Sequence, residues 1–115
     1  MRANKPMRNE LILIAALCSA GAISVSAADA KENWEKHCAK CHAADGTGKT
    51  KMGEKLKVKD LTDAKVQGDF KDDAAAKAIK EGVKDGDSTK MKPFGEALTD
   101  DEIKALVAHV RKFKK

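Results

Sequence analysis

Five consecutive residues, Cys38-Ala39-Lys40-Cys41-His42, constrain this 115-residue chain more than any other feature. On a helical turn Cys38, Cys41 and His42 occupy positions i, i+3 and i+4, so their side chains project from one face. Two thiols can then reach the vinyl groups on one edge of a porphyrin, and the imidazole can reach its iron. The pattern C-x-x-C-H is the attachment signature of a c-type haem, so it predicts thioether bonds to both cysteines and His42 as an iron ligand.

Two other kinds of site share part of this spacing. A thioredoxin-like redox pair also has two cysteines separated by two residues, but it needs a βαβ context that the sequence does not show. A structural zinc site needs a second pair of ligands, and no cysteine follows Cys41. The histidine directly after the second cysteine favours haem over both alternatives.

The composition supports a bound cofactor. Aromatic residues make up 3% of the chain and charged residues 36%, which leaves few large apolar side chains for a core. Small domains of this kind usually need a covalent cross-link, a metal or a cofactor for stability, and a buried haem would supply apolar surface. The length suits one domain, and the absence of sustained two-residue alternation predicts an all-α fold.

The first 27 residues have the pattern of a secretory signal peptide. A basic start precedes an apolar run at Leu11–Leu17 and then a stretch of small residues. We place cleavage after Ala27, with Ala28 or Ala30 as alternatives, which leaves residues 28–115 as the mature domain. The apolar run is shorter than the ~20 residues that cross a membrane, so an uncleaved anchor is less favoured. The pattern predicts a periplasmic protein whose mature chain is not inserted in the membrane.

The charge of the mature chain is small but unevenly distributed. Cleavage removes three basic residues and one acidic residue, which lowers the net charge from +5 to +3. Such a charge is not typical of a nucleic-acid-binding protein. Lysines gather around and after the motif, where they form either an ordinary solvated face or a basic rim that steers an acidic redox partner. They are Lys40, Lys49, Lys51, Lys55, Lys57 and Lys59, followed later by Lys90 and Lys92.

The first and last predicted helices are expected to pack against each other. The first covers Ala30–Cys38, has Asp29 as its N-cap and directs Trp34 into the core. The last runs from Asp100 to about Phe113 behind a capping box that begins at Thr99. It carries an apolar stripe with helical spacing, and the face of the first helix that bears Trp34 is the obvious partner. The stripe consists of Ile103, Leu106, Val107 and Val110.

A second helix and several loops are expected between these two. The helix runs from Asp72 or Asp73 to Glu81, and Gly82 directly after it is the expected stop residue. Residues 49–59 and residues 84–90 show no clear period and are predicted to be loops. The loop Asp45–Gly48 contains two glycines, which would let the backbone run close against a flat ring.

Two methionines are candidates for a second axial ligand. Lys92 precedes a proline and is therefore held extended, which puts Met91 on a non-helical stretch of chain. Met52 is the rival, because it follows His42 by ten positions, a length of chain that can reach the other face of a porphyrin. A buried methionine is also often only a packing residue, so the residues themselves leave both candidates open.

The mature chain resembles a small bacterial class I cytochrome c, a single-haem electron carrier. The resemblance covers residues 30–115 and rests on the haem motif and four other segments, which are Asp45–Gly48, Ile79–Val83, Met91–Phe94 and Leu98–Ile103. It implies a fold of three main helices in which the first and last cross, with loops wrapped around one covalent haem c. It also implies that His42 and Met91 coordinate the iron from opposite sides.

The function implied by the resemblance is one-electron transfer and not catalysis. A monomer would exchange electrons with membrane or periplasmic redox proteins that present an acidic docking face. Two axial ligands would leave no open position at the iron. Two alternatives remain: a haem enzyme or gas- or peroxide-binding cytochrome with an open sixth position, and the haem subunit of a larger dehydrogenase or oxidase.

The sequence departs from the family pattern at three places. Ala43 follows the motif histidine, where the family usually has glycine. No proline lies between His42 and Lys92, although many members have one there whose carbonyl orients the proximal histidine. His109 stands where the last helix of the family often carries an aromatic residue.

Overall fold

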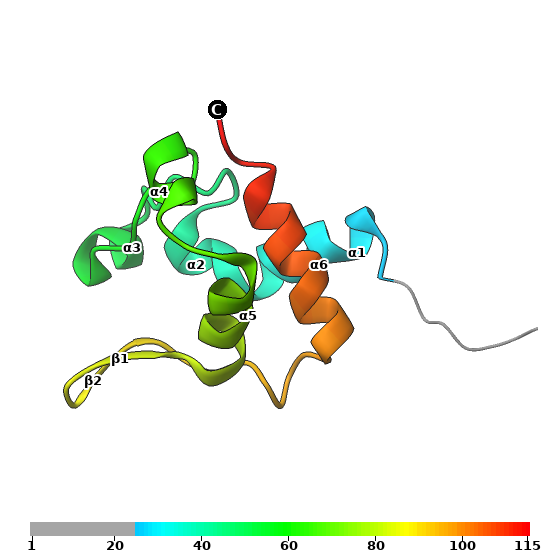
Figure 1. The fold of residues 1–115 in the computed structure, drawn as a ribbon. Helices are drawn as coiled ribbons and strands as arrows, with labels where there is room; N and C mark the ends of the chain where they lie inside the picture. Colours follow the sequence, from blue (N-terminus) through cyan, green and yellow to red (C-terminus); the bar gives the residue numbers. More distant parts are fainter. Residues whose placement is uncertain (1–24) are drawn as a thin grey trace, which may run out of the picture.

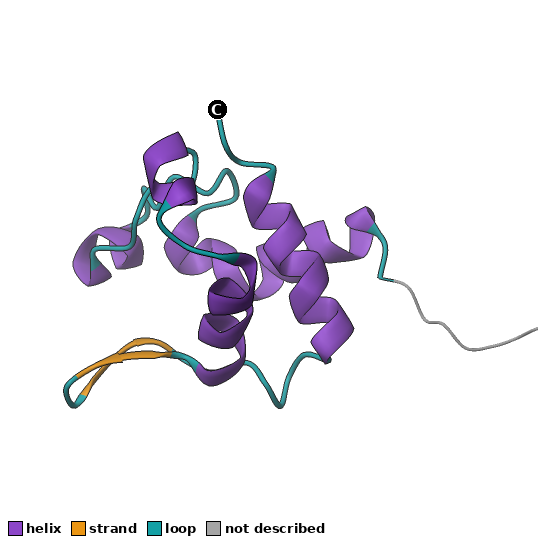
Figure 2. Cartoon of the chain, viewed as in Figure 1, coloured by secondary structure: helices purple, strands orange, loops and turns teal. Residues whose placement is uncertain are grey.

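The computed structural model describes residues 25–115, and most of the predicted signal peptide lies outside these residues (Figure 1). Figure 2 shows that helices dominate this part of the chain and that its strands form one hairpin. The predicted all-α class and crossed-helix fold are confirmed. No helix within residues 25–115 is long and apolar enough to cross a membrane. The elements are α1 (Ala27–Asn33), the π-helical segment η2 (Trp34–Cys38), α2 (Ala39–His42), α3 (Lys51–Leu56), α4 (Ala64–Gly68), α5 (Asp72–Glu81), β1 (Val83–Asp85), β2 (Ser88–Met91) and α6 (Asp100–Arg111).

The first helical segment begins earlier than the sequence indicated. Its N-cap is Ser26 and not Asp29, because the Ser26 hydroxyl accepts a hydrogen bond from the Asp29 backbone N–H at 3.1 Å. Asp29 is instead the third residue of the helix, and its carboxylate accepts from the Ser26 N–H at 3.4 Å to complete a capping box. Cleavage after Ala27 would remove this cap, so the cap belongs to the uncleaved chain.

The core lies where α6 crosses the segment formed by α1 and η2 (Figure 1). Ala30, Trp34 and Cys38 are buried on the first segment, as is the whole predicted stripe of α6. The capping box of α6 is also present, since Thr99 and Glu102 exchange hydrogen bonds of 2.8 and 3.1 Å. Burying each large aliphatic side chain contributes roughly 1.5–3 kcal/mol, so this crossing is the main source of apolar stabilisation.

Two segments predicted as loops are regular in the structure. Residues 51–56 form α3, which is capped by the Thr50 hydroxyl accepting from the Gly53 N–H at 2.8 Å. Six residues make fewer than two turns, so no apolar period can be recognised. Residues 83–91 form the antiparallel hairpin β1–β2, which turns at Gly86 with a φ of +64°. Both strands are largely exposed, so they show no alternation of apolar and polar residues.

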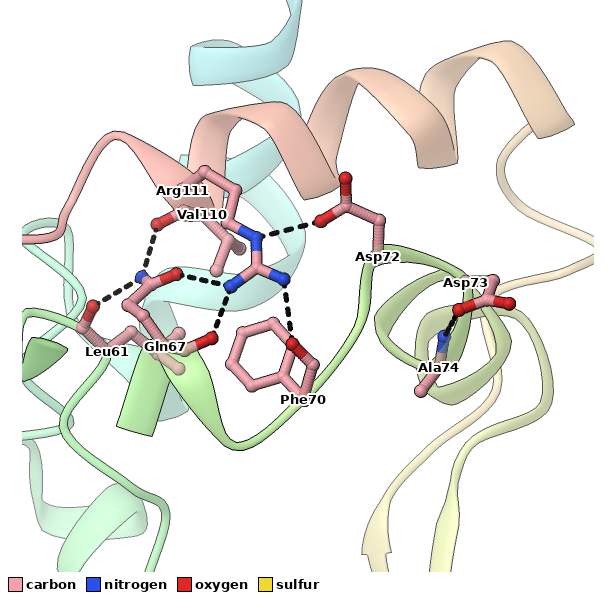
Figure 3. Close-up of polar contacts among 8 residues, drawn as sticks. All are labelled: Leu61, Gln67, Phe70, Asp72, Asp73, Ala74, Val110 and Arg111. Atoms are coloured by element: carbon pink, nitrogen blue, oxygen red, sulfur yellow. Dashed lines mark hydrogen bonds and ion pairs between the residues drawn. The ribbon is translucent and has the colours of Figure 1, made fainter. Parts of the chain in front are cut away.

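A polar network joins the end of α6 to α4 and to the start of α5 (Figure 3). The buried Gln67 side chain donates to the carbonyl oxygens of Leu61 and Val110 at 2.6 and 2.8 Å. The Arg111 guanidinium lies 4.3 Å from the centre of the Phe70 ring. It donates hydrogen bonds of 2.6 to 2.9 Å to Gln67, Phe70 and Asp72. Because each buried polar atom named here is paired, the network can stabilise a region with few apolar side chains.

Candidate haem site

A cleft of about 770 Å³ brings the predicted site residues together. Cys38, Cys41 and His42 line it from η2 and α2, and Met91 lines it from the end of β2. Met52 also lines it from α3, so both candidate methionines face the same space. Its volume is within the range of about 300–1,000 Å³ that is usual for ligand and cofactor sites.

The lining divides into an apolar interior and a basic rim. The apolar side chains come from α3 and the residues just after it, from the hairpin and from the segment that follows the hairpin: Met52, Leu56, Val58, Val83, Met91 and Phe94. Six lysines also line the cleft, and we call them the lysine rim: Lys36, Lys40, Lys57, Lys84, Lys90 and Lys92. This combination suits a large flat apolar group whose outer edge remains near solvent.

Partial burial and a ring contact define the surroundings of His42. Its ring packs against the Trp34 ring with a centroid distance of 5.5 Å and an interplanar angle of 38°. Burial lowers the pKa of His42 below its usual value, which favours the neutral imidazole that binds metals. Nδ1 is buried and has no hydrogen-bond partner among residues 25–115. His42 lines the cleft, and its other ring nitrogen, Nε2, is the candidate for an iron ligand.

Both motif cysteines are free thiols, and they differ in exposure. Cys38 is 5% exposed, whereas Cys41 is half-buried. Burial, with a smaller contribution from Cys41, raises the pKa of Cys38 to about 12, so this thiol is neutral at physiological pH. Two free thiols, a half-buried imidazole with a buried unpaired nitrogen and a thioether around one cleft form a donor set that fits a covalently attached haem.

The start of α3 supports the motif, a contribution that the sequence analysis missed. The Thr50 hydroxyl donates to the Cys41 carbonyl at 2.8 Å, and the Gly48 N–H donates to the His42 carbonyl at 2.8 Å. A Cβ on Gly53 would overlap the carbonyl oxygens of both Cys41 and Gly48. The Thr50-x-x-Gly53 spacing of a helix N-terminus was the available signal.

In the structure the glycine loop packs against the ring of Phe113. A Cβ on Gly46 would lie 2.5 Å from a ring carbon of Phe113, just beyond the end of α6. Gly46 also has a φ of +79°, which other residue types rarely adopt. The loop after the motif is thereby fastened to the last helix.

The hairpin is anchored mainly at its base. Phe94 and Gly95 donate backbone hydrogen bonds of 2.9 and 3.0 Å to the carbonyls of Ile79 and Lys80 at the end of α5. Gly82 has a φ of +81°, and a Cβ there would lie 2.6 Å from the Met91 carbonyl oxygen. These contacts place Met91 where β2 returns to the body of the protein.

Two histidines outside the motif have different surroundings. His37 lines the cleft and meets the Phe94 ring edge-on at 5.6 Å, a position that the sequence did not indicate. His109 is half-buried and packs against Trp34 at 5.7 Å and Phe113 at 5.0 Å. An imidazole therefore fills the place in the helix crossing where an aromatic residue was expected.

Comparisons with known proteins identify one family and two solved structures that resemble this chain. The sequence matches the family described as cytochrome c oxidase, cbb3-type, subunit III over residues 25–110. A solved structure of the KustC0563 c-type cytochrome is 38% identical, with a TM-score of 0.67, covering 75% of this chain and 98% of that one. A mutant of that cytochrome is also 38% identical, with a TM-score of 0.65, covering 75% and 99%. No curated protein matches the sequence significantly.

Proposed function

This chain belongs to the family of cbb3-type cytochrome c oxidase subunit III proteins, a family of small c-type cytochromes with covalent haem c, and we propose that it is a single-haem electron shuttle. Its donors and acceptors would be membrane or periplasmic redox proteins, reached after export and cleavage near Ala27. The observation that carries the proposal is the convergence of Cys38, Cys41, His42 and Met91 on one cleft.

Each of these residues has a distinct role in the proposal. Cys38 and Cys41 would hold the haem by thioether bonds, and the neutral imidazole of His42 would bind one face of its iron. The thioether of Met91 would bind the other face, and histidine with methionine favours a raised reduction potential. The bound haem supplies an iron centre that accepts and releases one electron.

Met91 is favoured over Met52 for the sixth position by its place in the chain. It ends β2 two residues before Pro93. The backbone there is held by the close contact between Gly82 and the Met91 carbonyl and by the hydrogen bonds that Phe94 and Gly95 donate to the end of α5. Met52 belongs to α3, whose N-cap residue Thr50 already bonds to the motif backbone at Cys41. A ligand for the opposite face of the iron is more readily supplied by a different wall of the cleft.

The lysine rim supports the choice of an acidic partner. Six ammonium groups around one opening, with Asp85 as the acidic residue among the cleft-lining side chains, produce a positive potential there. Such a potential accelerates encounter with an acidic surface and weakens as salt screens it. A monomer that docks weakly and briefly is what electron exchange with several partners requires.

An optical spectrum of the purified holoprotein tests the proposal. We expect low-spin iron in both oxidation states and a weak sulfur-to-iron band at the red end of the ferric spectrum. Met91→Ala should abolish this band, and Met52→Ala, the matched control, should retain it. The reverse result would transfer the ligand role to Met52.

The same preparation discriminates the alternatives. A high-spin ferric spectrum of the unaltered protein, or rapid carbon monoxide binding to its reduced form, would show an open sixth position and overturn the carrier. Copurification of a dehydrogenase or oxidase that high salt fails to release would show a fixed subunit instead of a shuttle.

A further inference from the structure

The orientation of His42 lacks its usual support. A histidine that binds metal commonly donates its other ring N–H to an oxygen acceptor, which fixes the ring plane. Here Nδ1 of His42 is buried without a hydrogen-bond partner among residues 25–115. Some other contact must therefore orient the imidazole. The unpaired buried nitrogen also costs stability.

Trp34 contacts the motif segment in three independent ways. Its carbonyl accepts the hydrogen bond of the Ala39 N–H, which closes the π-helical turn of η2. Its indole N–H donates to the Ala43 carbonyl at 2.9 Å. Its ring packs against the His42 ring. One side chain and its own backbone thus hold both ends of residues 39–43, and π-helical turns of this kind often occur at functional sites.

The peptide that Trp34 holds at Ala43 is strained. Ala43 has a φ of +69° and a ψ of 157°, a region that is almost restricted to glycine. The Ala43 N–H donates to the Ala39 carbonyl at 2.9 Å, and the indole bond fixes the carbonyl side of the same residue. Without the indole bond, rotation of this peptide could relieve the strain, and His42 directly before it would move.

Trp34 is itself held in place by residues of the last helical segment. It is 3% exposed, and its ring meets the His109 ring at 5.7 Å and the Phe113 ring at 5.0 Å. Both of these residues belong to the last helical segment or its end. The Trp34 side chain therefore links the last helical segment to the His42 ring.

We propose that Trp34 is the positioning residue of the proximal histidine, holding the strained Ala43 peptide and setting the plane of the His42 ring in place of an acceptor at Nδ1. This inference rests on the proposed role of His42 as an iron ligand. It assigns to Trp34 an effect on the electronic state of the haem as well as on stability.

Trp34→Phe in the holoprotein tests the proposal, because it retains an aromatic ring and removes the N–H. We expect the ferric electron paramagnetic resonance spectrum, which depends on the orientation of the axial imidazole, to change. The ratio of oxidised to reduced protein at a fixed potential should change by about threefold or more, and the unfolding constant should rise about tenfold. Ile103→Val is the control, since it removes one methyl group from the buried face of α6 and leaves the indole bond and the ring contacts of Trp34 in place; it should destabilise the protein with an unchanged spectrum.

A double variant separates positioning from packing. In Trp34→Phe with Ala43→Gly, the peptide is no longer strained, so the resonance spectrum and the redox ratio should return towards those of the unaltered protein. Ala43→Gly alone should lower the unfolding constant about threefold, because relief of the left-handed strain exceeds the entropic cost of glycine.

Three outcomes would overturn the proposal. The first is an unchanged spectrum and redox ratio in Trp34→Phe, and the second is a double variant that shows no recovery. The third is a destabilised Ala43→Gly protein, which remains informative if Trp34→Phe does not accumulate. If the unaltered protein does not show the spectrum of a histidine-ligated haem, the proposed function is refuted instead. Failure of this inference and failure of the proposed function are therefore distinguishable.

Discussion

Cys38, Cys41 and His42 lie in a segment held on several sides, whereas Met91 lies at the end of a hairpin that projects from the helices (Figure 1). We call the first region, η2 with α2, the histidine wall and the second, β1 with β2, the methionine wall. Trp34, Thr50 and Gly48 each bond to the backbone of the histidine wall or the residue after it. The methionine wall has mostly exposed residues and tertiary backbone bonds only just beyond its base.

The difference indicates how the two axial positions depend on the fold. The histidine wall is held by hydrogen bonds from Trp34, Thr50 and Gly48 and by the burial of Trp34 and Cys38. The methionine wall has little apolar contact of its own, so a bond between Met91 and iron would contribute much of its stability. We therefore expect changes at the histidine wall to affect folding and attachment, and changes at the methionine wall to affect local motion and spectra.

The largest effect, complete loss of covalent haem, is expected when both motif cysteines are replaced. In a variant with Cys38→Ala and Cys41→Ala, covalent haem should be lost completely, because no other cysteine lies within residues 25–115. Haem staining after denaturing electrophoresis measures this directly. Cys18→Ala is the matched control and should keep full staining, since Cys18 belongs to the predicted signal peptide. Covalent haem in the double variant would show that the histidine wall is not the attachment site.

Hydrogen exchange compares the two walls in one experiment on the holoprotein. Amides of residues 84–90 should be less protected than those of α6 by about 1,000-fold or more, because they can open without disturbing the core. Met91→Ala should lower the protection of the hairpin further and leave that of α6 unchanged. Equal protection of the hairpin and α6 would show that the two walls unfold together, and the contrast drawn above would fail.

Two glycines in short helices test how closely the histidine wall is packed. Gly53→Ala should reduce the free energy of unfolding by about 3 kcal/mol, because the new Cβ would overlap the Cys41 and Gly48 carbonyls. Gly68→Ala is the control, since a Cβ there meets no atom within 4 Å and should be neutral or slightly stabilising. Urea unfolding of both variants measures the difference. Similar values for both would show that α3 moves freely relative to the motif.

The histidine wall was largely predictable because its signals are local. The motif spacing placed Cys38, Cys41 and His42 on one short segment, and the stripe and capping box of α6 gave the helix that packs behind it. The supports between these elements were not predictable. The bond from Trp34 to Ala43 depends on a π-helical turn and on a positive φ, and neither has a sequence signature when the residue is alanine.

The methionine wall was predicted only in part, for a different physical reason. Pro93 indicated an extended chain at Met91, but the pairing of β1 with β2 was missed because exposed strands carry no apolar period. The choice between Met91 and Met52 could not be made from chain length. In the structure both residues line the cleft, so the spectrum of each variant is needed to choose between them.

The smallest effect is expected at His109, which packs against Trp34 of the histidine wall, and it concerns the pH dependence of stability. Burial, followed by the nearby Lys112 ammonium, lowers the pKa of His109 below its usual value; Glu35 opposes this shift and Lys31 adds to it. The unfolded chain therefore binds a proton more readily than the folded one, so stability present above pH ~6.5 declines as the pH falls through the lowered pKa. His109→Phe retains a ring against Trp34 and removes this titration. Its stability relative to the unaltered holoprotein, measured by urea unfolding at pH 8, 6.5 and 5, should increase as the pH falls. Parallel losses in the two proteins would show that protonation of His109 does not weaken the support of Trp34.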